Sequence, residues 1–376
     1  MKTIGIVSAH FLPHLGGVER YTYNLAKSFI HMGKKVVIIT SLIEDLPCKE
    51  EIEGIIIYRL PSFSFMKGRM PVLNLNKECK SKIREIEQEQ LDGIIINTHL
   101  YTLSCWGAYW GGKKARKVIL LEHGTAHMDL GRIWLNQVGR IYEHLLMYVI
   151  KRYVSDFYGV SLACNKWLKH FGIKGKGVFY NAVDWEDLKE IKPYYRDKLQ
   201  IEKEKVILTF AGRLIEEKGI RKLCEAFEQL DKKKVCLIVA GDGALYLELK
   251  QRYPDVFWLG SIEHKQVMCL LSETDIYILP TDYPEGFPTT VLEAAMCGCS
   301  IITTDVGGTK ELIRDTSYGI LMKENSIREI KEELEKLLKN PKEMKQMGQR
   351  VQSQVKKYFT WDITVKKVIK ELDSKK

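Results

Sequence analysis

Short apolar runs alternate with amphipathic segments along the first half of the chain. The runs lack polar alternation and are rich in Ile and Val, which is typical of buried strands. They cover residues 3–8, 35–41, 54–60, 92–98, 117–121 and 156–160. Apolar residues at helical spacing predict helices between them, over residues 18–31, 73–89 and 137–152. Buried strands separated by helices predict a parallel sheet that is covered on both faces.

The same alternation begins again near residue 206. It predicts strands over residues 206–211, 235–240, 256–259, 275–279 and 300–304. Helices are expected over residues 219–230, 244–252, 265–272, 289–297 and 327–338. The polar segment 180–204 predicts a linker with a short helix. We therefore expect two doubly wound α/β domains, residues 1–180 and 181–359, with a final helix, about residues 360–376, that packs back on the first domain.

Composition indicates a globular enzyme, with 45% hydrophobic and 28% charged residues. No run of 18 apolar residues occurs, so we expect no transmembrane helix. The N-terminal segment lacks the cleavage site of a signal peptide, which predicts a cytoplasmic location. The nine cysteines include no CxxC pair, so we expect them to pack as small apolar groups.

Positive charge is concentrated in the first half of the chain. Residues 1–180 hold 25 Lys and Arg against 15 Asp and Glu, whereas residues 181–376 hold 33 of each kind. This excess predicts either an anionic membrane surface as a partner, with the protein peripheral on the inner face, or a solvated basic surface. No nucleic-acid motif is present, so nucleic acid is not an expected partner.

One basic segment of the first half is also rich in aromatic residues. Between two prolines it contains Phe63, Phe65, Met66, Lys67 and Arg69 in a loop-like context. If exposed, these residues suit an anionic interface or a large amphiphilic acceptor. If buried, they form a loop that packs on its own domain. They are candidate acceptor or membrane contacts.

Two turns join a strand to a helix and carry groups suited to phosphate. Gly16 and Gly17 allow close approach of the backbone to a ligand at a helix N-terminus, although a plain tight loop is the alternative. In the second turn, residues 212–219, Arg213 can form a bidentate fork to phosphate oxygens and Lys218 adds a point charge. The alternative is surface pairing with neighbouring glutamates.

Two carboxylates, Glu285 and Glu293, stand eight positions apart around a loop and the start of a helix. Carboxylates accept hydrogen bonds from sugar hydroxyls, and the intervening amides face whatever lies above the helix N-terminus. The alternative is a capped helix with one solvated glutamate, but that does not explain the apolar surroundings of Glu293.

His123 directly follows a predicted strand. Because ligands of open α/β sheets bind at the carboxyl ends of strands, we expect His123 to face a cleft between two opposed domains. There it would hydrogen-bond a sugar or stabilise developing charge. The alternative is a loop histidine whose hydrogen bonds are satisfied within the protein. His10, His14, His99 and His127 lie in neighbouring predicted loops, but no ligand spacing unites them, so we expect no metal site.

Together these motifs resemble the retaining glycosyltransferases of family 4, which have the GT-B architecture of two Rossmann-like domains facing across a cleft. The resemblance covers nearly the whole chain, and its most specific part is Glu285-x7-Glu293 with the preceding Arg213 and Lys218. The family often has Gly where this chain has Ala182, a difference that concerns the hinge and not the chemistry.

The resemblance implies a role for each motif. Arg213 and Lys218 would hold the donor diphosphate, Glu285 the donor sugar and Glu293 the ribose, while His123 would sit near the sugar. The other implied donor contacts are Gly16, Gly17, Gly212, Gly241, Asp242, Ile262, Gly286, Phe287, Thr289 and Thr290.

The expected reaction is transfer of a hexose or N-acetylhexosamine from a nucleotide diphosphate sugar to a glycan or lipid-linked acceptor, with retention, in cell-surface polysaccharide or glycolipid synthesis. A UDP-sugar is the commonest donor of the family. Fixed cations can stabilise the leaving diphosphate, so we expect no metal and no other cofactor. The alternatives are a sugar-nucleotide 2-epimerase on the same fold and a non-catalytic nucleotide-binding partner subunit.

Overall fold

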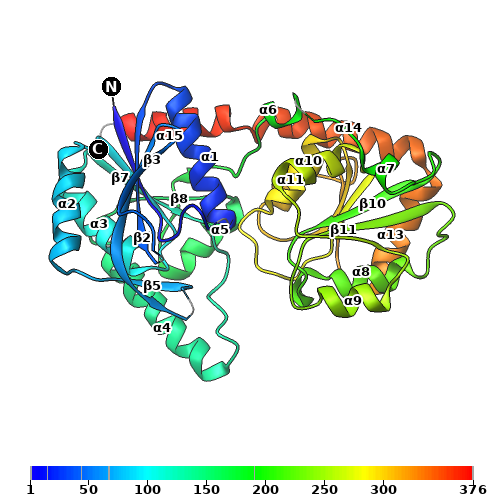
Figure 1. The fold of residues 1–376 in the computed structure, drawn as a ribbon, viewed down its shortest axis with the longest axis horizontal. Coiled ribbons are helices and arrows are strands. Elements are labelled where there is room, and N and C mark those ends of the chain that lie inside the picture. The colour runs from blue at the N-terminus through cyan, green and yellow to red at the C-terminus, as the bar shows by residue number, and fades with distance from the viewer. Residues whose placement is uncertain (1, 15, 44, 67, 190, 375–376) are drawn as a thin grey trace. The chain divides into compact units, whose positions relative to one another are not determined.

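The computed structural model describes residues 2–374 except residues 15, 44, 67 and 190 (Figure 1). The chain divides into two compact units: unit 1 comprises residues 1–181 and 361–376, and unit 2 comprises residues 182–360. The sequence pattern had placed this boundary after residue 180 and the return of the chain near residue 360. Both units are built on parallel sheets.

Unit 1 contains a nine-stranded sheet in the order β3-β4-β2-β1-β6-β7-β8-β9, with β5 paired to β4. The strands are β1 (Thr3–Val7), β2 (Lys35–Leu42), β3 (Lys49–Ile52), β4 (Ile55–Phe65), β5 (Met70–Leu73), β6 (Gly93–Asn97), β7 (Lys117–Glu122), β8 (Asp156–Gly159) and β9 (Gly177–Val178). β3 and β5 run antiparallel to β4, and the other pairs are parallel. Strand order reverses at β1, which makes the carboxyl ends of β1 and β6 a switch point.

The helices of unit 1 are α1 (Gly17–His31), α2 (Lys77–Gln88), α3 (Thr102–Lys114), α4 (Ile133–Ile150), α5 (Leu162–Leu168), the 3₁₀ turn η1 (Lys169–Phe171) and α15 (Trp361–Asp373). One hydrophobic cluster joins strand residues such as Ile94 to Ile86 of α2, Leu103 of α3 and Met147 of α4. The final helix α15 lies beside α1 (Figure 1), where Trp361 packs edge-on against the Tyr21 ring with centroids 5.0 Å apart.

The aromatic segment of unit 1 is a hairpin, so the expectation of a loop there was wrong. β4 continues to Phe65 and β5 returns antiparallel, with Phe63 opposite Val72. α2 begins only at Lys77 because the Asn76 side chain caps it, accepting a hydrogen bond from the Cys79 N–H at 2.8 Å. The helix predicted from residue 73 therefore starts too early, and β3 was not predicted.

Unit 2 contains a six-stranded parallel sheet in the order β12-β11-β10-β13-β14-β15. The strands are β10 (Val206–Ala211), β11 (Val235–Ala240), β12 (Phe257–Gly260), β13 (Ile276–Leu279), β14 (Ser300–Thr304) and β15 (Ile320–Met322). Successive strands are added on one side of β10 up to β12 and on its other side from β13 onward, so the strand order reverses between β10 and β13. Their carboxyl ends are therefore the point where a doubly wound sheet binds its ligand.

The helices of unit 2 are α6 (Glu186–Lys189), α7 (Tyr195–Lys198), the 3₁₀ turn η2 (Glu216–Lys218), α8 (Ile220–Phe227), α9 (Tyr246–Arg252), α10 (His264–Ser272), α11 (Thr289–Met296), α12 (Thr309–Leu312), α13 (Ile327–Lys339) and α14 (Pro341–Tyr358). The sequence pattern did not single out α14, which begins after a side-chain cap from Asn340 and packs against α11 and β14.

Candidate functional site

The loops that leave β10 and β13 touch each other at the switch point of unit 2. Gly219 has φ 72°, and a Cβ atom there would lie 1.8 Å from the carbonyl oxygen of Pro280. Only glycine therefore permits this approach. The N–H groups of Asp282 and Tyr283 donate to the Glu217 carbonyl at 2.7 and 3.0 Å. These backbone contacts fix the two loops against each other.

The contact brings the predicted diphosphate and sugar residues together. Lys218 Nζ forms an ion pair with Glu285 Oε1, and their side chains are only 12% and 16% exposed. The Arg213 guanidinium lies 5.0 Å from the centroid of the Tyr283 ring, and Lys218 Nζ lies 5.2 Å from the same centroid. Two cations thus gather on one aromatic ring beside the start of α8, an arrangement that favours a polyanionic ligand.

A third loop, after β14, supports the backbone of Glu285. Gly307 has φ 54°, and a Cβ atom there would lie 2.5 Å from the Glu285 carbonyl oxygen and 2.6 Å from that of Gly286. The neighbouring Phe287 is buried and its ring packs against Phe359, with centroids 5.4 Å apart. The peptide units between Glu285 and Phe287 therefore stand on a closely packed base.

Glu293 lies in α11, buried to 4% exposure, and its Oε1 is 2.9 Å from Nε2 of His264. Sequence reasoning missed His264, because its position at the start of α10 gives no spacing relation to Glu293. The signal that could have found it is its place directly after β12, at the same edge of the sheet. The pair holds one carboxylate oxygen in a fixed direction.

Tyr277 of β13 connects α11 to β10. Its hydroxyl lies 2.7 Å from Thr290 Oγ1 and 3.1 Å from the Ala211 carbonyl oxygen. Burial raises the pKa of Tyr277, so the phenol stays neutral and can donate. The Thr290 hydroxyl thus has a protein partner, and Thr289 begins the helix beside it.

The predicted nucleotide-base region consists of loops bonded to one another at the ends of β10, β11 and β12. The Leu214 N–H donates to the Asp242 carbonyl at 2.9 Å, and the Gly241 N–H donates to the Gly260 carbonyl at 2.7 Å. Ile262 follows β12 and is half-buried. Gly212 also belongs to this network, since its N–H donates to the Ala240 carbonyl at 3.0 Å.

In unit 1, the two glycines at the start of α1 have different surroundings. Gly16 caps the helix, and its N–H donates to Glu19 Oε2 at 2.8 Å. A Cβ atom on Gly16 would lie 2.5 Å from the same oxygen, whereas one on Gly17 would have no neighbour within 4 Å. Packing within unit 1 does not require glycine at either position, since the Glu19 carboxylate is the flexible end of its side chain, and the predicted phosphate contacts of Gly16 and Gly17 stay predictions.

His123 lies at the carboxyl end of β7. Burial lowers the pKa of His123 to about 4, despite the nearby Glu122, so the imidazole is neutral at pH 7. Its Nε2 lies 3.1 Å from the Asn97 Oδ1 atom, and its ring packs edge-on against Tyr21 at 4.9 Å. A neutral, oriented imidazole can exchange hydrogen bonds with a sugar but carries no fixed charge.

A buried charge network lies behind His123. His99 Nδ1 is 2.5 Å from Glu122 Oε2, and His99 Nε2 is 3.5 Å from Glu143 Oε2. Burial alone would lower the pKa of His99, but the two carboxylates raise it to about 9. Burial would conversely raise the pKa of Glu122, yet His99 and the Gly124 N–H lower it. Glu122 also accepts the His123 N–H at 3.1 Å, so the network positions the His123 backbone.

Two groups of exposed, large apolar side chains in unit 1 lie on single elements, the hairpin and α4. The hairpin presents Phe63, Phe65 and Met66, each 53% exposed, while Lys67 lies outside the described residues. The Arg69 carbonyl oxygen lies 3.4 Å from His10 Nε2. On α4 the exposed apolar residues include Ile133, Trp134, Val138, Ile141, Leu145 and Tyr148, which we call the α4 stripe. Among the described residues, no helix has both the length and the apolar content needed to span a bilayer.

Comparison with known families matches both halves of the chain. Residues 191–354 match the family described as "Glycosyl transferases group 1", and residues 15–187 match "Glycosyltransferase Family 4". An uncharacterized glycosyltransferase of Methanocaldococcus jannaschii is 25% identical over 96% of this chain and 95% of its own length. The GPI3 subunit of the phosphatidylinositol N-acetylglucosaminyltransferase of Saccharomyces cerevisiae is 28% identical over 82% of this chain and 69% of its own.

Solved structures match the whole chain at low sequence identity. Sucrose-phosphate synthase of Thermosynechococcus elongatus gives a TM-score of 0.77 at 17% identity, covering 99% of this chain and 98% of that one. HepE of Anabaena in complex with UDP-glucose gives a TM-score of 0.72 at 17% identity, covering 99% of each chain. These matches confirm the predicted fold class of two Rossmann-like domains.

The His99 network should stabilise unit 1. We expect His99→Ala to lower the free energy of unfolding by about 3–5 kcal/mol, because Glu122 and Glu143 are left buried without a cation. His31→Ala, at the exposed end of α1, is the matched control and should change little. Urea unfolding of the three proteins gives the comparison, and equal midpoints for His99→Ala and wild type would contradict it.

The same network has a definite pH dependence. The pKa of His99 is raised in the folded state, so its contribution is complete below the ordinary histidine pKa of 6.5 and disappears as pH rises through about 9. The stability difference between wild type and His99→Ala should therefore be larger at about pH 6 than at about pH 9.5. A difference independent of pH would show that His99 is not charged in the folded protein.

Proposed function

Because the chain is a glycosyltransferase with the GT-B fold, we propose that unit 2 binds a UDP-sugar and that the enzyme transfers its hexose or N-acetylhexosamine to a lipid-linked or glycan acceptor with retention. The observation that carries this proposal is the contact of Lys218 with Glu285 beside Arg213 at the switch point of unit 2. It unites a phosphate-binding pair with a sugar-binding carboxylate.

Arg213 and Lys218 bind the donor diphosphate in this proposal. Breaking a glycosyl–phosphate bond places negative charge on the leaving diphosphate, and fixed cations that need no reorganisation stabilise that charge. Arg213 provides a planar fork and Lys218 a compact charge, both held over the Tyr283 ring. We propose that binding of the diphosphate by these two side chains requires no metal ion.

Glu285 and Glu293 bind hydroxyl groups of the donor. The diphosphate competes with Glu285 for Lys218, and the carboxylate then accepts hydrogen bonds from the sugar. Glu293 has one oxygen at 2.9 Å from His264 Nε2, which orients the carboxylate so that it can accept from ribose. His264 thus acts as a positioning residue for the nucleoside end of the donor.

Retention follows from a front-face transfer in which the departing diphosphate accepts the proton of the acceptor hydroxyl. A double displacement needs a carboxylate nucleophile beside the scissile bond. Glu293 is buried and bonded to His264, and Glu285 is paired with the phosphate-binding Lys218. Neither is placed as a nucleophile, which supports the front-face route.

The relatives and structural neighbours support the choice of substrates. HepE was crystallised with UDP and with UDP-glucose, which favours a uridine donor. The yeast relative and a human relative, 26% identical over 95% of this chain, are subunits of phosphatidylinositol N-acetylglucosaminyltransferases. These names favour UDP-N-acetylglucosamine as the first donor to test and a phospholipid-type acceptor.

The α4 stripe supports an anionic membrane surface as the place of this reaction. Trp134, Val138, Ile141, Leu145 and Tyr148 recur at helical spacing, so they form one continuous exposed face. A soluble helix normally presents polar residues to water, whereas an interfacial helix presents aromatic and aliphatic ones to lipid. The excess of basic residues in the first half would add electrostatic attraction.

The donor site is tested by single substitutions. Lys218→Ala should lower the rate of UDP-N-acetylglucosamine hydrolysis by about 10²–10³-fold, since it removes a charge that stabilises the leaving group. Glu285→Gln should also lower the rate. Lys232→Ala, which removes an equal charge from the surface of unit 2, is the control and should keep full activity. Unchanged turnover in Lys218→Ala, with the fold intact, would refute the site.

The stereochemical proposal is tested on the product. ¹H NMR of the first product formed from an α-linked donor should show an α-configured anomeric proton. A β-configured product would exclude the front-face route. Release of a 2-epimerised sugar without any acceptor would instead establish the isomerase alternative.

Membrane binding is tested with vesicles of phosphatidylglycerol and phosphatidylcholine. We expect sedimentation with anionic vesicles at low salt, weakened about tenfold or more by Trp134→Glu combined with Ile141→Glu, because each apolar side chain contributes about 1.5–3 kcal/mol when buried. Leu247→Glu, at an exposed apolar position in unit 2, is the matched control. If the double variant and Leu247→Glu bind the vesicles equally well, α4 is not part of the membrane contact.

A further inference from the structure

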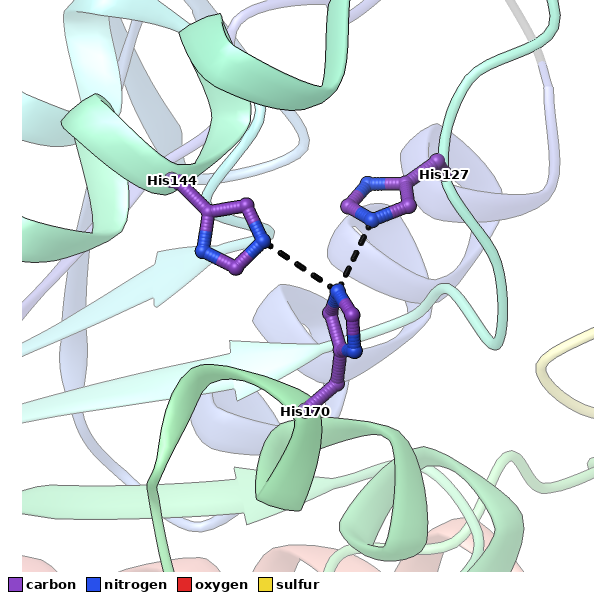
Figure 2. Close-up of side chains that lie close together, drawn as sticks. All are labelled: His127, His144 and His170. Atoms are coloured by element: carbon purple, nitrogen blue, oxygen red, sulfur yellow. Dashed lines mark hydrogen bonds between the residues drawn. The ribbon is translucent and has the colours of Figure 1, made fainter. Parts of the chain in front are cut away.

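Three histidines of unit 1 converge although they are distant in sequence. His127 lies in the loop after β7, His144 on α4 and His170 in η1. Figure 2 shows that the rings of His127 and His144 both point toward the ring of His170. His170 Nε2 lies 2.9 Å from His127 Nε2 and 3.2 Å from His144 Nε2. The nearest ligand atoms of the three residues all lie within 4.8 Å of one another.

Hydrogen bonding alone does not account for this arrangement. In a neutral imidazole, Nε2 has either one proton or one lone pair in the ring plane, so it forms one good hydrogen bond. Here two imidazole nitrogens approach the same Nε2 atom. Two nitrogens that bind one tetrahedral zinc ion at 2.0–2.1 Å are about 3.3 Å apart. The two separations from His170 Nε2, 2.9 and 3.2 Å, are near this value.

The cluster also has the outer contacts that metal-binding histidines need. His127 Nδ1 lies 2.7 Å from Glu143 Oε2, and Glu143 Oε1 accepts the Met128 N–H at 2.9 Å. A carboxylate on Nδ1 fixes the tautomer in which Nε2 presents its lone pair to a metal. The His170 ring stacks on Trp167 with centroids 4.9 Å apart and planes inclined by 7°, which holds its orientation.

We propose that His127, His144 and His170 bind one Zn²⁺ ion through their Nε2 atoms. His144 and His170 are exposed, so the ion can enter from solvent and keep its fourth coordination position for water or a small ligand. Imidazole ligands also accept Co²⁺ and Ni²⁺, which provides spectroscopic substitutes. The site lies wholly in unit 1 and is independent of the donor site of unit 2.

Zinc binding would join three separate segments of unit 1. The loop after β7 that begins with His123 would be tied to α4 and to η1. Glu143 would carry the connection further inward, because the same carboxylate contacts both His127 and His99. The ion would therefore order the segment that follows the predicted sugar-contacting histidine.

The experiment uses full-length protein with its affinity tag removed and its metals stripped by a chelator. Titration with ZnCl₂ should show one site per chain by calorimetry and an increase in the thermal midpoint. The His144→Ala and His170→Ala variants should each lose most of the affinity. His31→Ala removes an exposed histidine elsewhere in unit 1 and should bind as wild type does. Absence of zinc binding, or equal binding by His31→Ala and both ligand variants, would overturn the proposal.

The cobalt spectrum of the wild-type protein does not depend on any variant folding. Addition of Co²⁺ to wild-type protein should produce the intense visible bands of a tetrahedral cobalt site, and excess Zn²⁺ should abolish them. Glu143→Gln should weaken binding about 10–100-fold, as expected for loss of an outer carboxylate. A spectrum that resembles hydrated Co²⁺ would count against three histidine ligands.

Discussion

The close contact between the loops after β10 and β13 determines where the charged groups of unit 2 lie. Gly219 allows its backbone to rest against the Pro280 carbonyl, which no residue with a Cβ atom could do in this conformation. Lys218 immediately precedes that glycine and Glu285 lies in the loop after β13, so their ion pair is a consequence of backbone packing. The glycosyltransferase chemistry proposed for this unit depends on that approach, because it puts a phosphate-binding cation beside a sugar-binding carboxylate before any donor arrives.

Much of the fold and of the candidate donor site could be predicted from the sequence, because the patterns that indicate them are local. Buried strands of the parallel sheets appear as uniform apolar runs, and their loops follow at once, so Arg213, Lys218 and Glu285 could be placed at strand ends. The β4–β5 hairpin was missed although Ser62 to Phe65 alternate polar and apolar residues, because Pro61 and Pro71 at the two ends of the segment favoured a loop. The pairing of His264 with Glu293 and the convergence of the three histidines were missed, because tertiary packing, not spacing, brings these residues to their partners.

Unit 1 positions its groups by buried charge. Glu122, His99 and Glu143 form a continuous line from the end of β7 to α4, and Glu143 continues it to His127. Each carboxylate has two or more donors, which makes the burial of charge tolerable. Such a network is sensitive to the loss of any member, since the remaining charges cannot reach water. It therefore links the surroundings of His123 to the histidine cluster by electrostatics as well as by packing.

Helix α4 takes part in both proposals for unit 1. Its buried face carries Glu143 and Met147, its outer face carries the α4 stripe, and His144 lies beside Leu145 of that stripe. A metal bound to His144 and a membrane bound to the stripe would therefore act on one rigid element. Thermodynamic linkage requires any effect of zinc on membrane affinity to be matched by an equal effect of the membrane on zinc affinity. Because His144 and Leu145 are adjacent on α4, this helix is where any coupling between the two equilibria would act.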